Sequence, residues 1–207
     1  MKRICLLLFL GCLISVGWAE VILQENFGGP VFPPAGWDIE INGSGPLWQA
    51  DWIRGSLYGY SNYAEGNAIT SGMPPFTETS HAIARLYSPF FTLNQADQFR
   101  VVVCSYSESL NPPAIPNKMM VLENGSIVAV YNFPFQFCAL KPSITEWNIG
   151  INQTSYLYRV CWQCEALSTM QGMSNRLGID NVVLSVTSTR NTFLVPTSLG
   201  SIKSAYR

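Results

Sequence analysis

Charged side chains are scarce in this sequence: Asp, Glu, Lys and Arg together make up 12% of its 207 residues, and the formal net charge is −1. It contains neither a basic stripe nor a block of Lys and Arg. A protein that neutralises phosphates needs such clusters, so nucleic acid and an anionic membrane surface are excluded as partners. Aromatic residues make up 13%, which favours strands and aromatic-rich loops over exposed charged helices.

The sequence also lacks an apolar run long enough to cross a membrane, which takes ~20 residues. The run Ile4–Val16 is too short, but it follows two basic residues, and Gly17–Ala19 places small residues where a signal peptidase reads. Residues 1–19 are therefore predicted to be a cleavable secretory signal, with cleavage before Glu20. We expect the mature chain to be secreted, extracellular or on the cell surface, without a transmembrane span.

Catalytic residues are equally sparse. His81 is the single histidine, and its place at the start of a strand-like run favours a hydrogen-bonded structural role. The sequence has no Gly-x-Ser-x-Gly elbow, no His-Glu-x-x-His and no phosphate-binding glycine loop. We therefore expect that the protein is not an enzyme. A small secreted glycoside hydrolase stays open as an alternative, because two of the 13 acidic residues are all that such chemistry needs.

Four cysteines follow the signal: Cys104, Cys138, Cys161 and Cys164. Export makes one or two disulfides an expectation, with three possible pairings. The spacing of Cys161 and Cys164 matches a redox or zinc pair. However, they lie in a strand-like run, where residues three apart point to opposite faces. We interpret them as core cysteines or as halves of separate disulfides.

Helical periodicity is almost absent, and strand-like runs alternate with clusters of Gly, Pro, Asn and Ser. The candidate strands are Val21–Asn26, Trp37–Ile41, Leu47–Ile53, Asn67–Thr70, His81–Tyr87, Gln98–Tyr106, Lys118–Glu123, Ile127–Asn132, Tyr156–Cys164 and Leu177–Val186. The dipeptide Asn124-Gly125 predicts a type I′ hairpin turn. About ten strands in one domain predict an all-β, jelly-roll β-sandwich with little helix. We place this domain at 20–186, followed by a linker and a short basic tail at 187–207.

Several phrases occur in an order that is specific as a set. They are Glu25-Asn-Phe27, Phe32-Pro-Pro-Ala-Gly-Trp37, Trp48, Gly66-Asn-Ala-Ile69, Leu86-Tyr-Ser-Pro-Phe-Phe-Thr-Leu93, Glu146-Trp147 and Ile179-Asp-Asn-Val-Val-Leu184. Over roughly residues 21–186, the sequence resembles the choice-of-anchor J domains, which are related to cleaved-adhesin and MAM-like jelly rolls. The resemblance implies an extracellular, galactose-binding-like sandwich that serves adhesion or ligand binding and is not an enzyme.

A metal site follows in part from this resemblance, which implies a structural calcium where the first and last strands meet. Glu25 ends the first candidate strand, and Asp180 lies in the last. Strand alternation places Asp180 on the same face as Val182, Leu184 and Val186, so a buried Asp180 needs hydrogen-bond donors or a cation. Calcium takes such oxygen ligands. The alternative is that Asp180 accepts backbone N–H groups and Glu25 is solvated.

The best candidate ligand surface is the segment Gly55–Glu65, which we expect to be an adaptable loop. It interleaves Tyr58, Tyr60 and Tyr63 with Gly, Ser and Asn, and Trp52 precedes it. Aromatic rings of this kind stack on the apolar faces of sugars, and phenol and amide groups bind hydroxyls. The competing interpretation is that these aromatic residues cover an edge of the sandwich and that the nearby Trp48 belongs to the core.

The sequence therefore leaves three candidate functions open. The first is a secreted or cell-surface, non-enzymatic binding or adhesion module whose partner is a glycan or a surface protein. The second is a structural module of the bacterial surface with protein–protein contacts only. The third is the small glycoside hydrolase. The tail Leu199–Arg207 is interpreted as either a sorting or docking tag or a frayed end.

Overall fold

The computed structural model describes residues 19–45, 48–57, 60–70, 79–93, 98–110, 115–134, 143–150, 156–168 and 173–187. These residues form strands joined by turns and irregular segments, without any helix. It follows that these ranges contain no helix of the length and apolarity that a membrane crossing requires. The predicted all-β class is confirmed.

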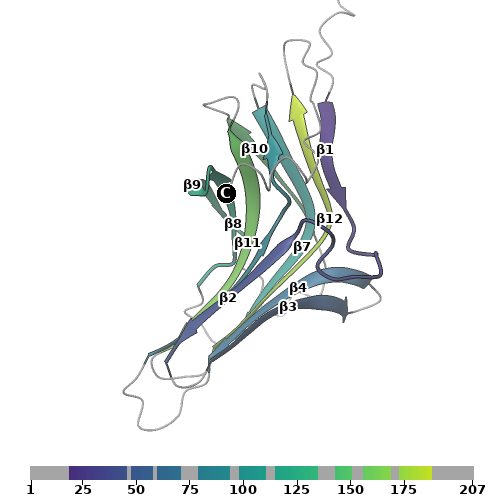
Figure 1. The fold of residues 1–207 in the computed structure, drawn as a ribbon. Helices are drawn as coiled ribbons and strands as arrows, with labels where there is room; N and C mark the ends of the chain where they lie inside the picture. Colours follow the sequence, from purple (N-terminus) through teal and green to yellow (C-terminus); the bar gives the residue numbers. More distant parts are fainter. Residues whose placement is uncertain are drawn as a thin grey trace, which may run out of the picture.

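Twelve strands form two sheets in the described part of the chain. They are β1 (Ala19–Glu25), β2 (Asp38–Ser44), β3 (Trp48–Leu57), β4 (Tyr60–Thr70), β5 (Ser80–Tyr87), β6 (Phe91–Thr92), β7 (Gln98–Leu110), β8 (Lys118–Glu123), β9 (Ser126–Asn132), β10 (Ser143–Gly150), β11 (Leu157–Ser168) and β12 (Met173–Thr187). Sheet A has the order β10-β7-β12-β4-β3, and β1 also pairs with β12. Sheet B has the order β2-β5-β11-β8-β9, and β6 also pairs with β11. Together they make the predicted jelly-roll sandwich, in which β3 and β4 curve away from the upper part of β7 and β12 (Figure 1).

The core lies between the sheets because the strands alternate in burial. In β5, every second residue is buried, and Ala82, Ala84 and Leu86 are completely inaccessible to solvent. The two alanines leave room for large aromatic side chains. Trp162 of β11 is fully buried and stacks on Trp37, with 5.6 Å between ring centroids. Such ring pairs contribute about 0.5–1.5 kcal/mol beyond the area they bury.

Positive φ angles mark two places in the sheets, one where the chain turns and one where a strand changes which residues face the core. Asn124 (φ 48°) and Gly125 (φ 83°) form the tight turn between β8 and β9, which confirms the predicted type I′ hairpin. Asn181 also has a positive φ of 48°. It lies where the register between β12 and β7 shifts, and such a shift is a β-bulge.

The bulge overturns the predicted position of Asp180. Buried residues occupy odd positions before the bulge, at Leu177 and Ile179, and even positions after it, at Val182 and Leu184. Strict alternation ignores the extra residue, so it placed Asp180 on the core face. In the structure Asp180 is half-buried and lies on the opposite side of β12.

Trp48 was also assigned wrongly. It is 40% exposed rather than part of the core, because β3 is the edge strand of sheet A. Its ring covers the backbone of Gly43 on β2, where an added Cβ would overlap the indole. The alternative assignment of this region, as a cover for the edge of the sandwich, describes Trp48 well.

The predicted strands missed two elements and made several others too short. The short β6 and the whole of β10 were absent from the candidate strands. The segment Gly55–Glu65 was treated as a loop, but β3 and β4 run through most of it as paired strands. Its many Gly, Ser and Asn residues lower strand propensity, yet pairing with β12 on the far side of β4 overrides that preference.

Candidate functional site

The outer face of sheet A, which points away from sheet B, carries a row of polar side chains across four strands. Asp51 of β3 is level with Asn67 of β4, which is level with Arg176 of β12 and then Glu108 of β7. We call these four residues the polar row. Each strand contributes one hydrogen-bonding side chain to the row. Because neighbouring strands lie about 4.8 Å apart, these side chains follow one another at about that spacing.

Contacts link the polar row from end to end. The Asn67 amide donates to Asp51 Oδ1 at 2.9 Å, and Arg176 Nε donates to Asn67 Oδ1 at 3.3 Å. Arg176 also lies 3.9 Å from Glu108. The side chain of Arg176 is 40% exposed, so its guanidinium still has donors that face solvent.

Beside the polar row lies a cluster of two tyrosines around a buried carboxylate. The side chain of Glu65 is only 5% exposed, and Arg176 lies 3.4 Å from it. The Tyr63 hydroxyl donates to Glu65 Oε2 at 2.7 Å, and the Tyr106 hydroxyl donates to Tyr63 at 3.3 Å. Burial and the hydrogen bond to Glu65 raise the pKa of Tyr63. Burial and the hydrogen bond to Tyr63 likewise raise the pKa of Tyr106, so both phenols stay protonated donors.

Two glycines make space for these rings. A Cβ on Gly55 would overlap the Tyr63 ring, and a Cβ on Gly178 would overlap the Tyr106 ring. Because glycine has no side chain, each tyrosine ring can lie flat across the backbone of a neighbouring strand. Packing against these strands therefore helps the hydrogen bonds to hold the two phenol groups in place.

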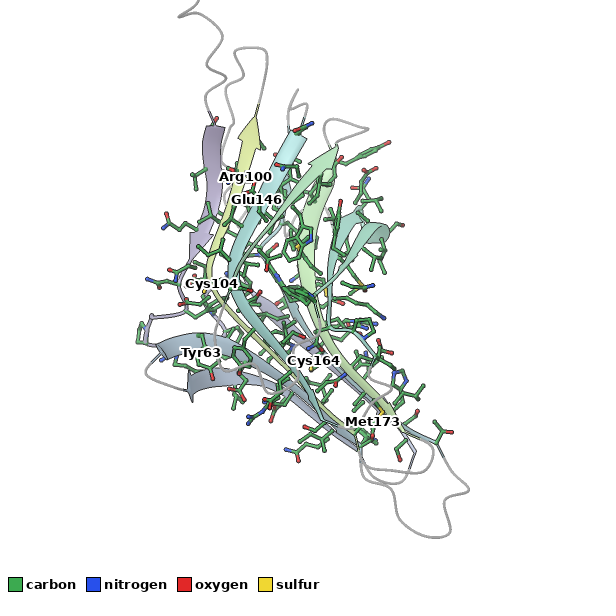
Figure 2. All side chains as sticks on the ribbon, turned by 180° about the vertical axis from the view of Figure 1, so that it is seen from behind. Tyr63, Arg100, Cys104, Glu146, Cys164 and Met173 are labelled. Atoms are coloured by element: carbon green, nitrogen blue, oxygen red, sulfur yellow. The ribbon has the colours of Figure 1, made fainter. Side chains whose placement is uncertain are left out.

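Of the four predicted aromatic contacts, two are buried, and the side chains of the other two are not described. Tyr63 and Trp52 are each 4% exposed, so neither ring offers a free face for stacking on a sugar. Trp52 lies in the core, over Gly66, where an added Cβ would be 2.7 Å from the indole ring. Tyr58 and the side chain of Tyr60 lie outside the described residues. Figure 2 shows Tyr63 on the lower part of sheet A, on the side away from Cys164.

Sequence reasoning missed the polar row and the buried Glu65. A signal was present, since Glu65 and Asn67 are polar residues two positions apart in a segment that can form a strand. That spacing places both side chains on one face. It went unused because the segment was taken as a loop, and because the strand that contains Arg176 was started too late.

Glu25 and Asp180 are brought together, as the metal prediction required. β1 pairs with β12, with Glu25 level with Val182. Burial and the charge of Glu25 raise the pKa of Asp180, so the two carboxylates repel each other. Each already accepts one backbone N–H: Glu25 from Phe27 at 2.6 Å, and Asp180 from Asn181 at 2.7 Å. Within the described ranges, no group of three or more His, Cys, Asp or Glu side chains could hold a metal ion.

The cysteines do not form the expected disulfides among themselves. Cys104, Cys161 and Cys164 are free thiols, and Cys138 lies outside the described residues. Cys164 belongs to the core, whereas Cys161 lies on the outer face of sheet B, level with Tyr87. This confirms that residues three apart on this strand face opposite ways. Burial raises the pKa of Cys161 to about 12, so the thiol is unreactive at neutral pH.

A second polar network covers the outer face of sheet B, and its groups bind one another. His81 Nε2 lies 2.9 Å from Glu165 Oε1, and Lys118 donates to Glu165 Oε2 at 3.0 Å. Arg85 donates to Gln163 at 2.7 Å and to Glu40 at 2.9 Å. These contacts hold the described polar groups of this face in place, and His81 has the hydrogen-bonded role that was predicted for it.

Comparisons with known proteins give weak likenesses in fold. No protein-family model matches the chain, and no curated protein matches its sequence. Similar solved structures include the K1 cleaved adhesin domain of Lys-gingipain from Porphyromonas gingivalis W83, at 14% identity and a TM-score of 0.42, covering 83% of this chain and 99% of that one. Another is the CBM22-1 xylan-binding domain from Paenibacillus barcinonensis, at 9% identity and a TM-score of 0.41, covering 84% and 99%.

A third similar structure is the enzymatically active domain of tailspike protein 4 from bacteriophage CBA120, at 12% identity and a TM-score of 0.43. The match covers 73% of this chain but 19% of the tailspike domain. These three proteins have different activities in their names, and the likeness to them concerns the β-sandwich fold. Membership of the choice-of-anchor J family therefore stays a prediction.

Proposed function

We propose that the chain is an exported, non-enzymatic binding module that holds a glycan on the outer face of sheet A. The polar row is the observation that carries this proposal. It places an amide and a guanidinium donor between two carboxylate acceptors, and sugar hydroxyls need both kinds of group because each one donates and accepts. The half-buried Tyr106 ring beside the row offers apolar surface for the C–H face of a sugar.

The charge of this surface favours a neutral sugar. The polar row and the neighbouring Glu65 contain three carboxylates, from Asp51, Glu65 and Glu108, against the single guanidinium of Arg176, so acidic groups outnumber basic ones on this surface. An anionic polysaccharide would meet repulsion at three of these positions. Tyr58 and Tyr60 are proposed as further contacts, because the chain connects β3 to β4 at one end of the same face.

The test is a binding assay on neutral and anionic polysaccharides with matched arginine variants. Arg176→Gln removes the charged donor from the polar row and should weaken binding to a neutral glycan about tenfold, the effect of losing a charge-assisted hydrogen bond. Arg100→Gln is the control. Arg100 lies on the same sheet but at the upper end, where it pairs with Glu146 (Figure 2). The Arg100→Gln variant should therefore bind like wild type. Circular dichroism checks that both variants fold.

Each outcome of this assay has a definite meaning. Equal binding by wild type and the Arg176 variant would remove the polar row from the proposal. A loss confined to a Tyr58→Ala/Tyr60→Ala variant would move the site to the connection between β3 and β4. If none of the polysaccharides binds, the structural module with protein–protein contacts is favoured. If shorter sugars are released from a polysaccharide, the glycoside hydrolase is favoured.

We also propose that Glu25 and Asp180 hold a structural calcium ion. Their mutual repulsion supports this, since a cation between them would remove it, and carboxylate oxygens suit calcium. Backbone carbonyls must supply the other ligands, so we expect affinity in the range of about 10⁻⁴–10⁻³ M that extracellular modules show. Bound calcium would join the end of β1 to the bulge of β12.

Thermal melting with calcium tests this site. Calcium at about ten times the expected dissociation constant should raise the melting temperature of wild type, and magnesium should not. Asp180→Asn should respond to neither ion. Because the folded-state pKa of Asp180 is raised, its ionised form costs stability above that pKa. In chelator at neutral pH the Asn variant should therefore be at least as stable as wild type. A wild-type melting curve that calcium leaves unchanged would contradict the proposal.

A further inference from the structure

Strand β9 is an open edge of sheet B. Among the described residues it pairs with β8 alone, so one side of its backbone has no strand beside it. Ile127, Val128 and Val130 are 55%, 52% and 52% exposed. The register between β8 and β9 shifts at this point and leaves Val128 without a partner on β8. Three large aliphatic side chains thus reach solvent along one strand.

The composition of β9 differs from that of the other edge strands. Natural sheets protect their edges with charged residues, which discourage the pairing of one edge with another. β1 carries Glu20 and Glu25, β2 carries Asp38 and Glu40, β3 carries Asp51 and Arg54, and β10 carries Glu146. The remaining edge strand, β6, is only two residues long, and a very short edge is protected by its length. β9 reads Ser-Ile-Val-Ala-Val-Tyr-Asn and contains no charge and no proline. The protection that the other edges have is missing here.

The order of residues in β9 is complementary to itself. In an antiparallel pair of two β9 strands centred on Ala129, Val128 of one copy is opposite Val130 of the other, and Ile127 is opposite Tyr131. The polar ends, Ser126 and Asn132, also meet each other. A two-fold symmetric interface requires this property, because each residue contacts its counterpart twice by symmetry.

We propose that β9 is a dimerisation edge, where it pairs in antiparallel fashion with β9 of a second copy of this chain. The pairing satisfies backbone groups that no other described strand binds, and it brings the exposed aliphatic side chains of the two copies into contact. An uncharged strand of mostly aliphatic residues fits a copy of itself better than a charged partner. Sheet B then continues from one molecule into the other, while the outer face of sheet A stays accessible on both.

The oligomeric state of the purified chain tests the proposal. Sedimentation across a concentration series should show a monomer–dimer equilibrium for wild type. Val130→Lys places two like charges across the interface and should weaken association by at least roughly tenfold. Ile144→Lys is the control, since Ile144 is 78% exposed on β10, the edge strand of the other sheet, and this variant should dimerise like wild type. A monomer at every concentration, or equal dimerisation of the Val130 variant, would overturn the proposal.

Cross-linking tests the register independently of the lysine variants. Chains with Val128→Cys and chains with Val130→Cys carry tags of different size and are mixed before air oxidation. Opposite residues in an antiparallel pair bring their Cα atoms to about 4.5–5.5 Å, within the range that a disulfide spans. The mixture should therefore give a cross-linked species with both tags. Equal cross-linking within each single-variant sample would exclude the antiparallel pairing around Ala129.

Discussion

Carboxylates in this protein differ in how their negative charge is compensated. Glu165 accepts hydrogen bonds from Lys118 at 3.0 Å and from Gln163 at 2.7 Å. Asp180, by contrast, lies close to a second carboxylate. Burial raises the pKa of Glu165, but the hydrogen bonds from Lys118 and His81 outweigh it, so the net effect is a lowered pKa. Glu165 therefore stabilises the fold as an anion, whereas Asp180 does so only when it is neutral or bound to a cation.

Substituting Glu165 tests this compensation. Glu165→Gln keeps the shape but loses the charge, so the free energy of unfolding at pH 7 should fall by about 1.5–3 kcal/mol. The lowered pKa gives the direction of the pH dependence. The contribution is present above the ordinary value of 4.5 and is lost as pH falls through the folded-state pKa. The difference between the variant and wild type should accordingly shrink in acid.

Urea unfolding at a series of pH values measures the effect of Glu165. Glu146→Gln is the matched control, because Glu146 forms its ion pair with Arg100 on the surface, where the two side chains are 41% and 43% exposed. Solvent screens such a pair, so little change is expected there. A Glu165 variant whose stability follows wild type at every pH would contradict the compensation.

At the scale of the elements, β12 organises the candidate site. It contributes Arg176 to the polar row, Gly178 to the space for Tyr106, and Asp180 to the proposed calcium site. The strand also pairs with β7 along most of its length, with β4 over its first half and with β1 over its second half. The bulge at Asn181 divides β12 into two halves, because different residue positions face the core before and after it.

Gly178→Ala tests whether β12 needs its glycine. The added methyl group would overlap the Tyr106 ring, and forced repacking of this kind costs about 1–3 kcal/mol. Removing the ring with Tyr106→Ala should make the same glycine substitution less costly, which a double-mutant cycle detects. Thermal and urea unfolding of the four chains give the coupling.

Gly150→Ala is the control for the glycine substitution. Gly150 ends β10, and no atom lies within 4 Å of an added Cβ there. That variant should be as stable as wild type, or slightly more stable, because alanine restricts the unfolded chain. If Gly178→Ala is equally harmless, the flat packing of Tyr106 does not depend on the missing side chain.

The sequence predicts the whole molecule better than it predicts the site. The hairpin at Asn124-Gly125 and the buried Trp37 follow from local chemistry, since only certain residues tolerate that turn and a large indole ring favours burial. The polar row does not follow in this way, because its members lie far apart in the chain and only the pairing of four strands makes them neighbours. The bulge at Asn181 is likewise a tertiary feature, so strict alternation failed at Asp180.

The pairing of β1 with β12 has a mechanical consequence. Ala19, at the start of β1, is level with Thr187, at the end of β12, and the two strands lie side by side (Figure 1). A force applied to these two ends therefore separates the outermost residue pair of β1 and β12 first and then each following pair in turn. A load that enters through Arg176 and leaves through Thr187 runs along β12 and is resisted by β7, which pairs with β12 on both sides of the bulge. We therefore expect the domain to yield more easily when it is stretched between the ends of β1 and β12 than when it is stretched between the proposed glycan site and the end of β12.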